Sequence, residues 1–99
     1  MVEDDEVTAR ALTRVLKHRG HTVEHVGTVP DAQSRLKEGV YDVLLADRNV
    51  CGRIAWDLAT EVPVGVHVVR MSGHAPIASP PYWQKGVNLP LLFEMIEEH

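Results

Sequence analysis

The chain has 99 residues, the size of one domain, and residues 1–99 are treated as a single domain. Hydrophobic residues make up 44% and charged residues 24%, which is typical of a globular protein, and the net charge of -4 argues against nucleic acid as a direct partner. A single cysteine, Cys51, excludes an internal disulfide, and apolar runs of about five residues are too short to span a membrane.

The first predicted element is a helix over Val7–Arg19. Acidic residues precede it and basic residues end it, as the helix dipole favours. Its inward stripe is expected to consist of Ala11, Leu12, Val15 and Leu16. Gly20 ends this helix, and His21–Val26 is predicted to be a short strand.

A second helix is predicted to begin after Thr28. Thr28 and Asp31 resemble a capping box, Pro30 lies in the first turn, and Gly39 ends the helix. A strand is then predicted over Val40–Asp47. Its VLLA run is apolar on both faces, which is typical of strands in a parallel sheet.

The second half of the chain predicts a helix over Ile54–Val62 and a strand over Val64–Met71. Residues Gly73–Pro81 hold three prolines and are predicted to form a loop. A short strand is expected over Tyr82–Gln84. Asn88 caps a last helix through residue 98, whose inward residues are expected to be Leu89, Leu92, Phe93 and Ile96.

This alternation of helices and strands predicts an α/β layer fold with right-handed crossovers. Such a domain normally opens with a buried strand, yet only Met1 and Val2 precede the acidic residues. We expect the first strand to be a stub or to be missing from the chain. Truncation is favoured over deletion, because losing a central strand would cost more than the roughly 5–15 kcal/mol by which domains are stable.

Polar residues follow four of the apolar runs: Glu3 and Asp4 after Val2, then Asp47, Ser72 and Lys85. Functional groups of open α/β sheets gather beyond the C-terminal ends of strands, so we expect these side chains to converge. Neighbouring carboxylates repel each other unless a cation intervenes, and Mg²⁺ prefers hard oxygen ligands. The pattern therefore suggests a magnesium site that handles a phosphoryl group.

The segments VEDDE, LLADRN, MSGHA and YWQKGV, in this order, resemble the receiver domain of two-component response regulators. The resemblance covers nearly the whole chain. It implies a doubly wound, flavodoxin-like parallel sheet with strand order 2-1-3-4-5. It also implies a role for each matching residue: Glu3 and Asp4 hold Mg²⁺, Asp47 accepts the phosphoryl group and contacts the metal, Asn49 ligates the metal through its backbone carbonyl, Ser72 is the switch hydroxyl, Lys85 is the lysine of the pattern, and Tyr82 is the switch aromatic.

The sequence also departs from the family pattern. Ser72 and Lys85 are too close in sequence for the usual fourth helix, which is expected to be shortened, absent or not described. The segment between Asp47 and Gly52 is short and lacks the usual proline. Gly86 stands where the family has a proline that favours a cis bond, so the position of the lysine is left open.

The resemblance implies a function in signalling. A sensor histidine kinase or phosphotransfer protein would phosphorylate Asp47 in a Mg²⁺-dependent reaction, and the phosphorylated domain would switch its binding to a downstream effector. Such a domain turns over no external substrate, so we do not expect an enzyme. The alternative is a pseudo-receiver, a binding module that works without phosphorylation. An aspartate-dependent phosphatase is not favoured, because Asn49 stands where such enzymes carry a second aspartate.

A second copy of the chain is kept open as a partner, no direct nucleic-acid or membrane contact is expected, and the expected location is the cytoplasm. His21 and His25 would share a face of the predicted strand, but two imidazoles without a cysteine make a poor zinc site. Cys51 has no evident base beside it and is interpreted as a free loop cysteine.

Overall fold

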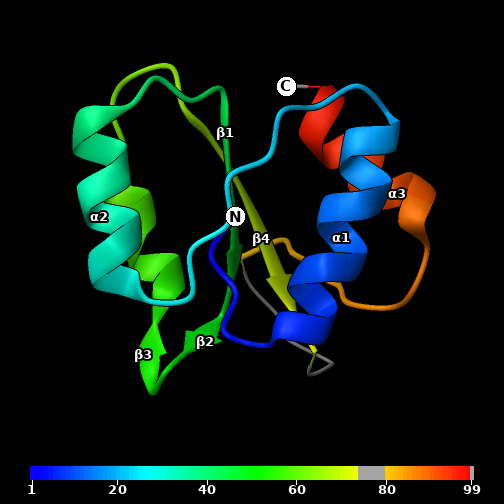
Figure 1. The fold of residues 1–99 in the computed structure, drawn as a ribbon, viewed down its shortest axis with the longest axis horizontal. Coiled ribbons are helices and arrows are strands. Elements are labelled where there is room, and N and C mark those ends of the chain that lie inside the picture. Colours follow the sequence, from blue (N-terminus) through cyan, green and yellow to red (C-terminus); the bar gives the residue numbers. More distant parts are fainter. Residues whose placement is uncertain (74–79, 99) are drawn as a thin grey trace.

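A parallel sheet lies between two layers of helices, with α1 and α3 on one face and α2 on the other (Figure 1). The computed structural model describes residues 1–73 and 80–98. Its elements are α1 (Glu6–His18), α2 (Val29–Glu38), β1 (Val43–Asp47), β2 (Asn49–Val50), β3 (Arg53–Ile54), the 3₁₀ helix η1 (Ala55–Thr60), β4 (His67–Ser72), β5 (Trp83–Gln84) and α3 (Leu89–Glu97).

The sheet has the predicted strand order, although its central strand is a stub. β1 pairs in parallel with β4, and β4 pairs in parallel with β5. On the other side of β1, Val2 forms parallel bridges to both Ala46 and Val26. The order is therefore Val26, Val2, β1, β4, β5, which confirms the expected 2-1-3-4-5 arrangement with the first strand reduced to one bridging residue.

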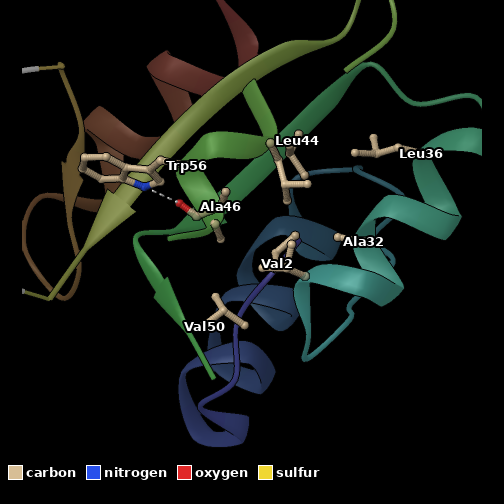
Figure 2. Close-up of a cluster of buried hydrophobic side chains, with 10 residues drawn as sticks. Val2, Ala32, Leu36, Leu44, Ala46, Val50 and Trp56 are labelled. Carbon is tan, nitrogen blue, oxygen red and sulfur yellow. Dashed lines mark hydrogen bonds between the residues drawn. The ribbon is translucent and has the colours of Figure 1, made fainter. Parts of the chain in front are cut away.

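Two apolar clusters cover the two faces of the sheet, and β1 contributes to both. Leu44 and Ala46 face α2 and η1, whereas Leu45 faces α1 and α3, because side chains alternate along a strand. Figure 2 shows the first cluster, in which the Trp56 indole Nε1 donates a hydrogen bond to the carbonyl of Ala46 at 3.0 Å. The second cluster consists of Leu12, Leu16, Leu45, Val69, Met71, Trp83, Leu92 and Ile96.

The helix ends follow the capping chemistry of the sequence. The hydroxyl of Thr28 accepts a hydrogen bond from the Asp31 amide at 3.2 Å at the start of α2, and Gly39 ends this helix. Asn88 begins α3 by accepting a hydrogen bond from the Leu91 amide at 3.2 Å. These predicted caps are confirmed.

Several expected boundaries were wrong. Only Val26 of the predicted strand His21–Val26 pairs, and the predicted third helix is the shorter 3₁₀ helix η1. β1 and β4 each begin three residues later than expected, at Val43 and His67. The valines before them, Val40 and Val64, are fully exposed beside turns, so their apolar character was misleading.

The inward faces of two helices also differ from expectation. In α1, Ala9 is buried and Ala11 is exposed, so the buried stripe is rotated relative to the predicted one. In α3, Leu92 and Ile96 are buried and Phe93 is half-buried, as expected, whereas Leu89 is 37% exposed. Leu89 is the first residue of its helix and lies at the rim of the core.

A small antiparallel hairpin of β2 and β3 follows the site strand β1 and was not predicted. Its turn residues, Cys51 and Gly52, have φ angles of 50° and 78°. Two central residues with positive φ are the signature of a type I′ turn, which favours tight hairpins. The hairpin accounts for the short segment after Asp47, and Cys51 is exposed, as expected for a free loop cysteine.

The link from β4 to β5 is short. It runs over residues 73–82, and residues 74–79 of the predicted loop lie outside the described residues. Its described parts, Gly73 and residues 80–82, contain no helix. Within the described ranges, no helix has the length and apolar character needed to cross a bilayer.

A groove of about 460 Å³ lies beside Met1 and β1. Its apolar lining includes Leu16, Val43, Leu45 and Ile96. We expect an added Val-Ile-Val extension before Met1 to raise the free energy of unfolding by about 1–2 kcal/mol, since apolar burial outweighs the ordering of three residues. Urea unfolding measures this gain. A Ser-Gly-Ser extension is the control, and equal effects of the two extensions would show that the groove does not take a strand.

An ion-pair cluster joins the end of α1 to the end of α3. Arg19 Nε and Nη2 lie 2.8 and 2.5 Å from the two carboxylate oxygens of Glu97, and His21 Nε2 lies 2.9 Å from one of them. The Arg19 guanidinium also lies over the Phe93 ring, 4.4 Å from its centroid. Hydrogen bonds from Arg19 and then His21 lower the pKa of Glu97 from 4.5 to about 2.

Because the pKa of Glu97 is depressed in the folded state, its contribution is present above pH 4.5 and is lost as the pH falls toward about 2. We expect Glu97→Gln to flatten the acid limb of the stability curve in this window, as followed by chemical unfolding at a series of pH values. Glu94→Gln, at an exposed position of the same helix, is the control and should leave the limb unchanged. Matching curves for Glu97→Gln and the unsubstituted protein would contradict the prediction.

Candidate functional site

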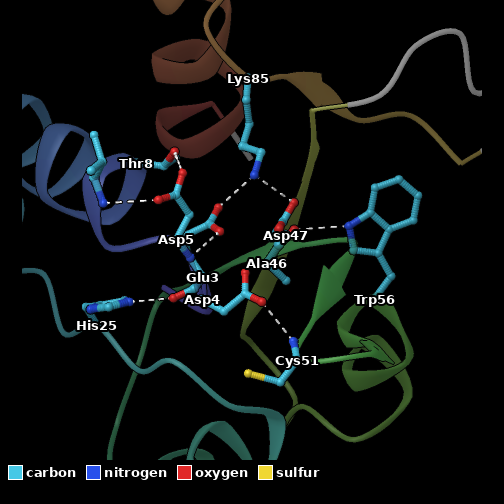
Figure 3. A network of polar contacts seen from close by, with 11 residues as sticks. Glu3, Asp4, Asp5, Thr8, His25, Ala46, Asp47, Cys51, Trp56 and Lys85 are labelled. Carbon is cyan, nitrogen blue, oxygen red and sulfur yellow. Dashed lines mark hydrogen bonds and ion pairs between the residues drawn. The ribbon is translucent and has the colours of Figure 1, made fainter.

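Four strand ends meet at one edge of the sheet and carry the predicted polar residues. Glu3 follows the bridging residue Val2, Asp47 ends β1, Ser72 ends β4, and Lys85 follows β5. Figure 3 shows Glu3, Asp47 and Lys85 pointing toward one another. Parallel pairing explains this convergence, because it places the C-terminal ends of all these strands on the same side.

Lys85 links the two buried acids. Its Nζ lies 2.9 Å from Glu3 Oε2 and 3.2 Å from Asp47 Oδ1. The backbone turns directly after it, with the Val87 amide donating to the Gln84 carbonyl at 3.3 Å and Gly86 at a φ of 82°. A proline, held near −65°, cannot adopt this angle. Gly86 therefore has a backbone angle that is closed to proline, and Lys85 reaches both acids.

The acidic residues after Val2 divide into two groups. Glu3 and Asp4 point toward the site, and Asp4 Oδ2 accepts a hydrogen bond from the Cys51 amide at 2.9 Å (Figure 3). Asp5 points away and caps α1, accepting hydrogen bonds from the Val7 amide at 3.2 Å and the Thr8 hydroxyl at 2.7 Å. Asp5 is thus the N-cap of α1, which begins at Glu6.

Carboxylate oxygens of Glu3, Asp4 and Asp47 lie within 4.8 Å of one another. Three carboxylates against the single ammonium of Lys85 leave an excess of negative charge in a partly buried space. A divalent cation would offset this excess, and hard oxygen donors are what Mg²⁺ prefers. A carboxylate has about four acceptor positions, so the existing hydrogen bonds leave room for a metal. The donor set therefore fits Mg²⁺.

Burial and hydrogen bonding act in opposite directions on the pKa values of Glu3 and Lys85. Glu3 is fully buried, and this burial raises the pKa of Glu3 although hydrogen bonds from Lys85 and the Asp5 amide oppose the shift. Burial lowers the pKa of Lys85, but hydrogen bonds to Glu3 and Asp47 outweigh it, so the net shift is upward. Lys85 is consequently held as a cation beside the acids.

The remaining predicted site residues lie around this centre. Ser72 is 1% exposed, its carbonyl accepts the Lys85 amide at 2.9 Å, and it lies one residue beyond Met71, the partner of Asp47 in the β1–β4 register. Asn49 lies in β2, two residues after Asp47, with an exposed side chain. Tyr82 is half-buried, and its ring centroid is 5.9 Å from that of Trp56.

Three contacts at the site were not foreseen. The His25 Nε2 lies 2.7 Å from the backbone carbonyl oxygen of Glu3. The Cys51 amide binds Asp4, and Trp56 connects Tyr82 to the carbonyl of Ala46, directly before Asp47. The histidines do not form a shared site, because His21 contacts Glu97 and His25 contacts Glu3.

Comparisons with known proteins identify the fold. No protein-family profile and no curated protein matches the sequence. A response regulator from Burkholderia pseudomallei, whose structure holds a phosphorylated aspartic acid and a calcium ion, aligns over 98% of this chain with a TM-score of 0.83 and 17% identity. This chain spans 64% of that protein's chain.

Two solved receiver domains align over a larger share of their own length. A CheY-like receiver domain from Methanospirillum hungatei JF-1 matches 98% of this chain and 87% of its own, with a TM-score of 0.84 and 21% identity. Another from Methylobacillus flagellatus matches 95% of this chain and 93% of its own, with a TM-score of 0.76 and 19% identity. Together with the strand order and the site at the strand ends, these alignments show that the chain has the CheY-like response regulator receiver fold.

Proposed function

We propose that this chain is a phospho-accepting receiver that takes a phosphoryl group on Asp47. The observation that carries the proposal is the convergence of Glu3, Asp4 and Asp47, with Lys85 Nζ between Glu3 and Asp47 at 2.9 and 3.2 Å. The phosphorylated aspartic acid in the Burkholderia protein of the same fold supports it by analogy.

In this proposal, Asp47 acts as the nucleophile. One of its carboxylate oxygens attacks the phosphorus of a phosphohistidine, a P–O bond forms, and the P–N bond breaks. The imidazole nitrogen leaves with the bonding electron pair and takes a proton from the solvent. The product is an acyl phosphate on Asp47. The partner that donates the group is a sensor histidine kinase or a phosphotransfer protein.

The neighbouring groups stabilise charge on the transferred phosphoryl group. Bound Mg²⁺ supplies electrostatic stabilisation of the phosphoryl oxygens. Lys85 is held as a cation next to Asp47 and can move its ammonium from the carboxylate to a phosphoryl oxygen. Ser72 lies one residue past Met71, the partner of Asp47 in the sheet. Its hydroxyl would donate a hydrogen bond to a second phosphoryl oxygen.

The chain turns over no external substrate in this scheme and acts by switching partners. New charge at Asp47 would recruit Ser72 and change the packing of Tyr82 on Trp56. The surface altered in this way would bind a downstream effector. We propose a cytoplasmic location, as histidine-kinase signalling would require.

Incubation with acetyl phosphate and Mg²⁺, followed by intact mass measurement, tests the proposal. We expect a mass gain of one phosphoryl group that is lost with EDTA and absent in Asp47→Asn. Asp57→Asn, at an exposed position in η1, is the matched control and should gain the same mass. No gain in the unsubstituted protein, or a gain that persists in Asp47→Asn, would overturn the proposal.

The alternative is a pseudo-receiver that binds partners without phosphorylation. The short link from β4 to β5 favours it, because residues 73–82 leave little length for the usual crossover helix next to Ser72. This alternative predicts a folded protein with no mass gain from acetyl phosphate. A mass gain restricted to Asp47 would exclude it.

A further inference from the structure

His25 lies outside the acidic cluster, yet it contacts the cluster's backbone. Its Nε2 is 2.7 Å from the carbonyl oxygen of Glu3, and Figure 3 shows the imidazole approaching Glu3 from the side opposite Lys85. Within the described ranges, no hydrogen bond ties the imidazole to a carboxylate. Its contact with the site therefore runs through the main chain of Glu3.

The hydrogen bond from His25 is the second contact that holds the main chain of Glu3. The Glu3 amide donates to the Val26 carbonyl at 3.1 Å, and Val26 is the residue directly after His25. One segment thus holds both sides of Glu3: Val26 accepts from its N–H, and His25 donates to its C=O. This arrangement leaves the Glu3 side chain directed at Lys85.

The orientation of that carbonyl controls where Asp4 points. The Glu3 C=O belongs to the planar peptide unit that joins Glu3 to Asp4. Rotation about the Cα–C bond of Glu3 alone would turn this carbonyl and displace Asp4 with it, so the Asp4 carboxylate would move relative to that of Glu3. A hydrogen bond on the carbonyl opposes the rotation and keeps the Asp4 carboxylate near the Cys51 amide and the other two acids.

We propose that His25 is a positioning residue for the divalent metal site, acting through the Glu3–Asp4 peptide rather than as a ligand. The inference rests on the proposed function, because it concerns the metal that the acids would hold. Groups that orient metal ligands from outside the coordination sphere commonly change affinity by about 10–100-fold when removed. His25 would set the affinity for Mg²⁺ without contacting it.

Mg²⁺ titration by isothermal calorimetry tests this role in the whole chain, using MgCl₂ alone as the ligand. We expect His25→Ala to raise the dissociation constant for Mg²⁺ about tenfold. His25→Gln keeps an N–H donor of similar reach and is expected to restore affinity to within about threefold of the unsubstituted protein. His18→Ala, at an exposed position of α1, is the control and should bind normally.

A thermal unfolding midpoint measured without Mg²⁺ separates positioning from general stability. The proposal expects all three variants to unfold near the midpoint of the unsubstituted protein, while only His25→Ala binds Mg²⁺ more weakly. Unchanged affinity in His25→Ala, equal weakening in His25→Gln, or an affinity loss that follows the midpoint would overturn the inference. Absence of Mg²⁺ binding in the unsubstituted protein would instead overturn the proposed function.

Discussion

Replacing Lys85 with methionine is expected to lower the free energy of unfolding by about 3 kcal/mol in the absence of divalent metal. Glu3 is fully buried, and Lys85 is the cation that contacts it, at 2.9 Å. Methionine keeps most of the apolar stem of lysine, so the change mainly removes the charge. The buried carboxylate would then remain beside Asp47 without compensation. Urea unfolding at neutral pH measures the loss.

Although Lys85→Met is expected to lose stability, it is expected to gain affinity for Mg²⁺. Without the ammonium, the acids attract a cation more strongly, so Lys85→Met is expected to bind Mg²⁺ more tightly while it loses the ability to be phosphorylated. Lys37→Met, at an exposed position of α2, should change neither property. A stability loss below about 0.5 kcal/mol, the usual range for surface substitutions, would show that the contact of Lys85 with Glu3 is not important for folding.

Saturating Mg²⁺ is expected to stabilise the unsubstituted protein, by about 2.7 kcal/mol at a concentration one hundred times the dissociation constant. Asp4→Asn removes a like charge from the cluster. It should therefore raise stability without metal and reduce the stability gained on adding Mg²⁺. Asparagine can still accept the hydrogen bond from the Cys51 amide. Thermal unfolding with and without MgCl₂ measures both effects.

The pKa of Glu3 determines how the stability gained from Mg²⁺ should change with pH. Burial raises the pKa of Glu3, so the folded protein binds a proton there more readily than the unfolded chain does. The contribution of Glu3 to stability without metal should therefore fall as the pH rises from 4.5 through the folded pKa, and the gain from Mg²⁺ should grow over the same window. Asp57→Asn is the control for Asp4→Asn. A Mg²⁺ gain that is equal in Asp4→Asn and in the control would contradict the metal site.

The convergence of the polar side chains of the site could be predicted from the sequence because the pattern is local to each strand. Each apolar run that crosses the core ends in a polar residue, and parallel pairing then brings Glu3, Asp47 and Lys85 to one edge of the sheet. The same logic predicted the caps at Thr28 and Asn88. These features depend on neighbours within a few residues, which a sequence displays directly.

Features set by distant residues or by backbone angles were not predictable in this way. Val40 and Val64 have the composition of strand residues but lie exposed beside turns. The β2–β3 hairpin depends on the positive φ of Cys51, an angle that a non-glycine residue rarely adopts. The contact between His25 and Glu3 joins positions 22 residues apart and has no local signal.

Locating a bound Mn²⁺ ion tests most directly whether the three acids form one divalent site opposite Lys85. Mn²⁺ takes the same oxygen ligands as Mg²⁺, and its paramagnetism broadens nuclear resonances close to it. We expect one ion per chain, with broadening of Glu3, Asp4 and Asp47 and of the neighbouring Lys85 and Cys51. Broadening centred on the acidic end of α3, at Glu94, Glu97 and Glu98, with these residues unaffected, would contradict the account.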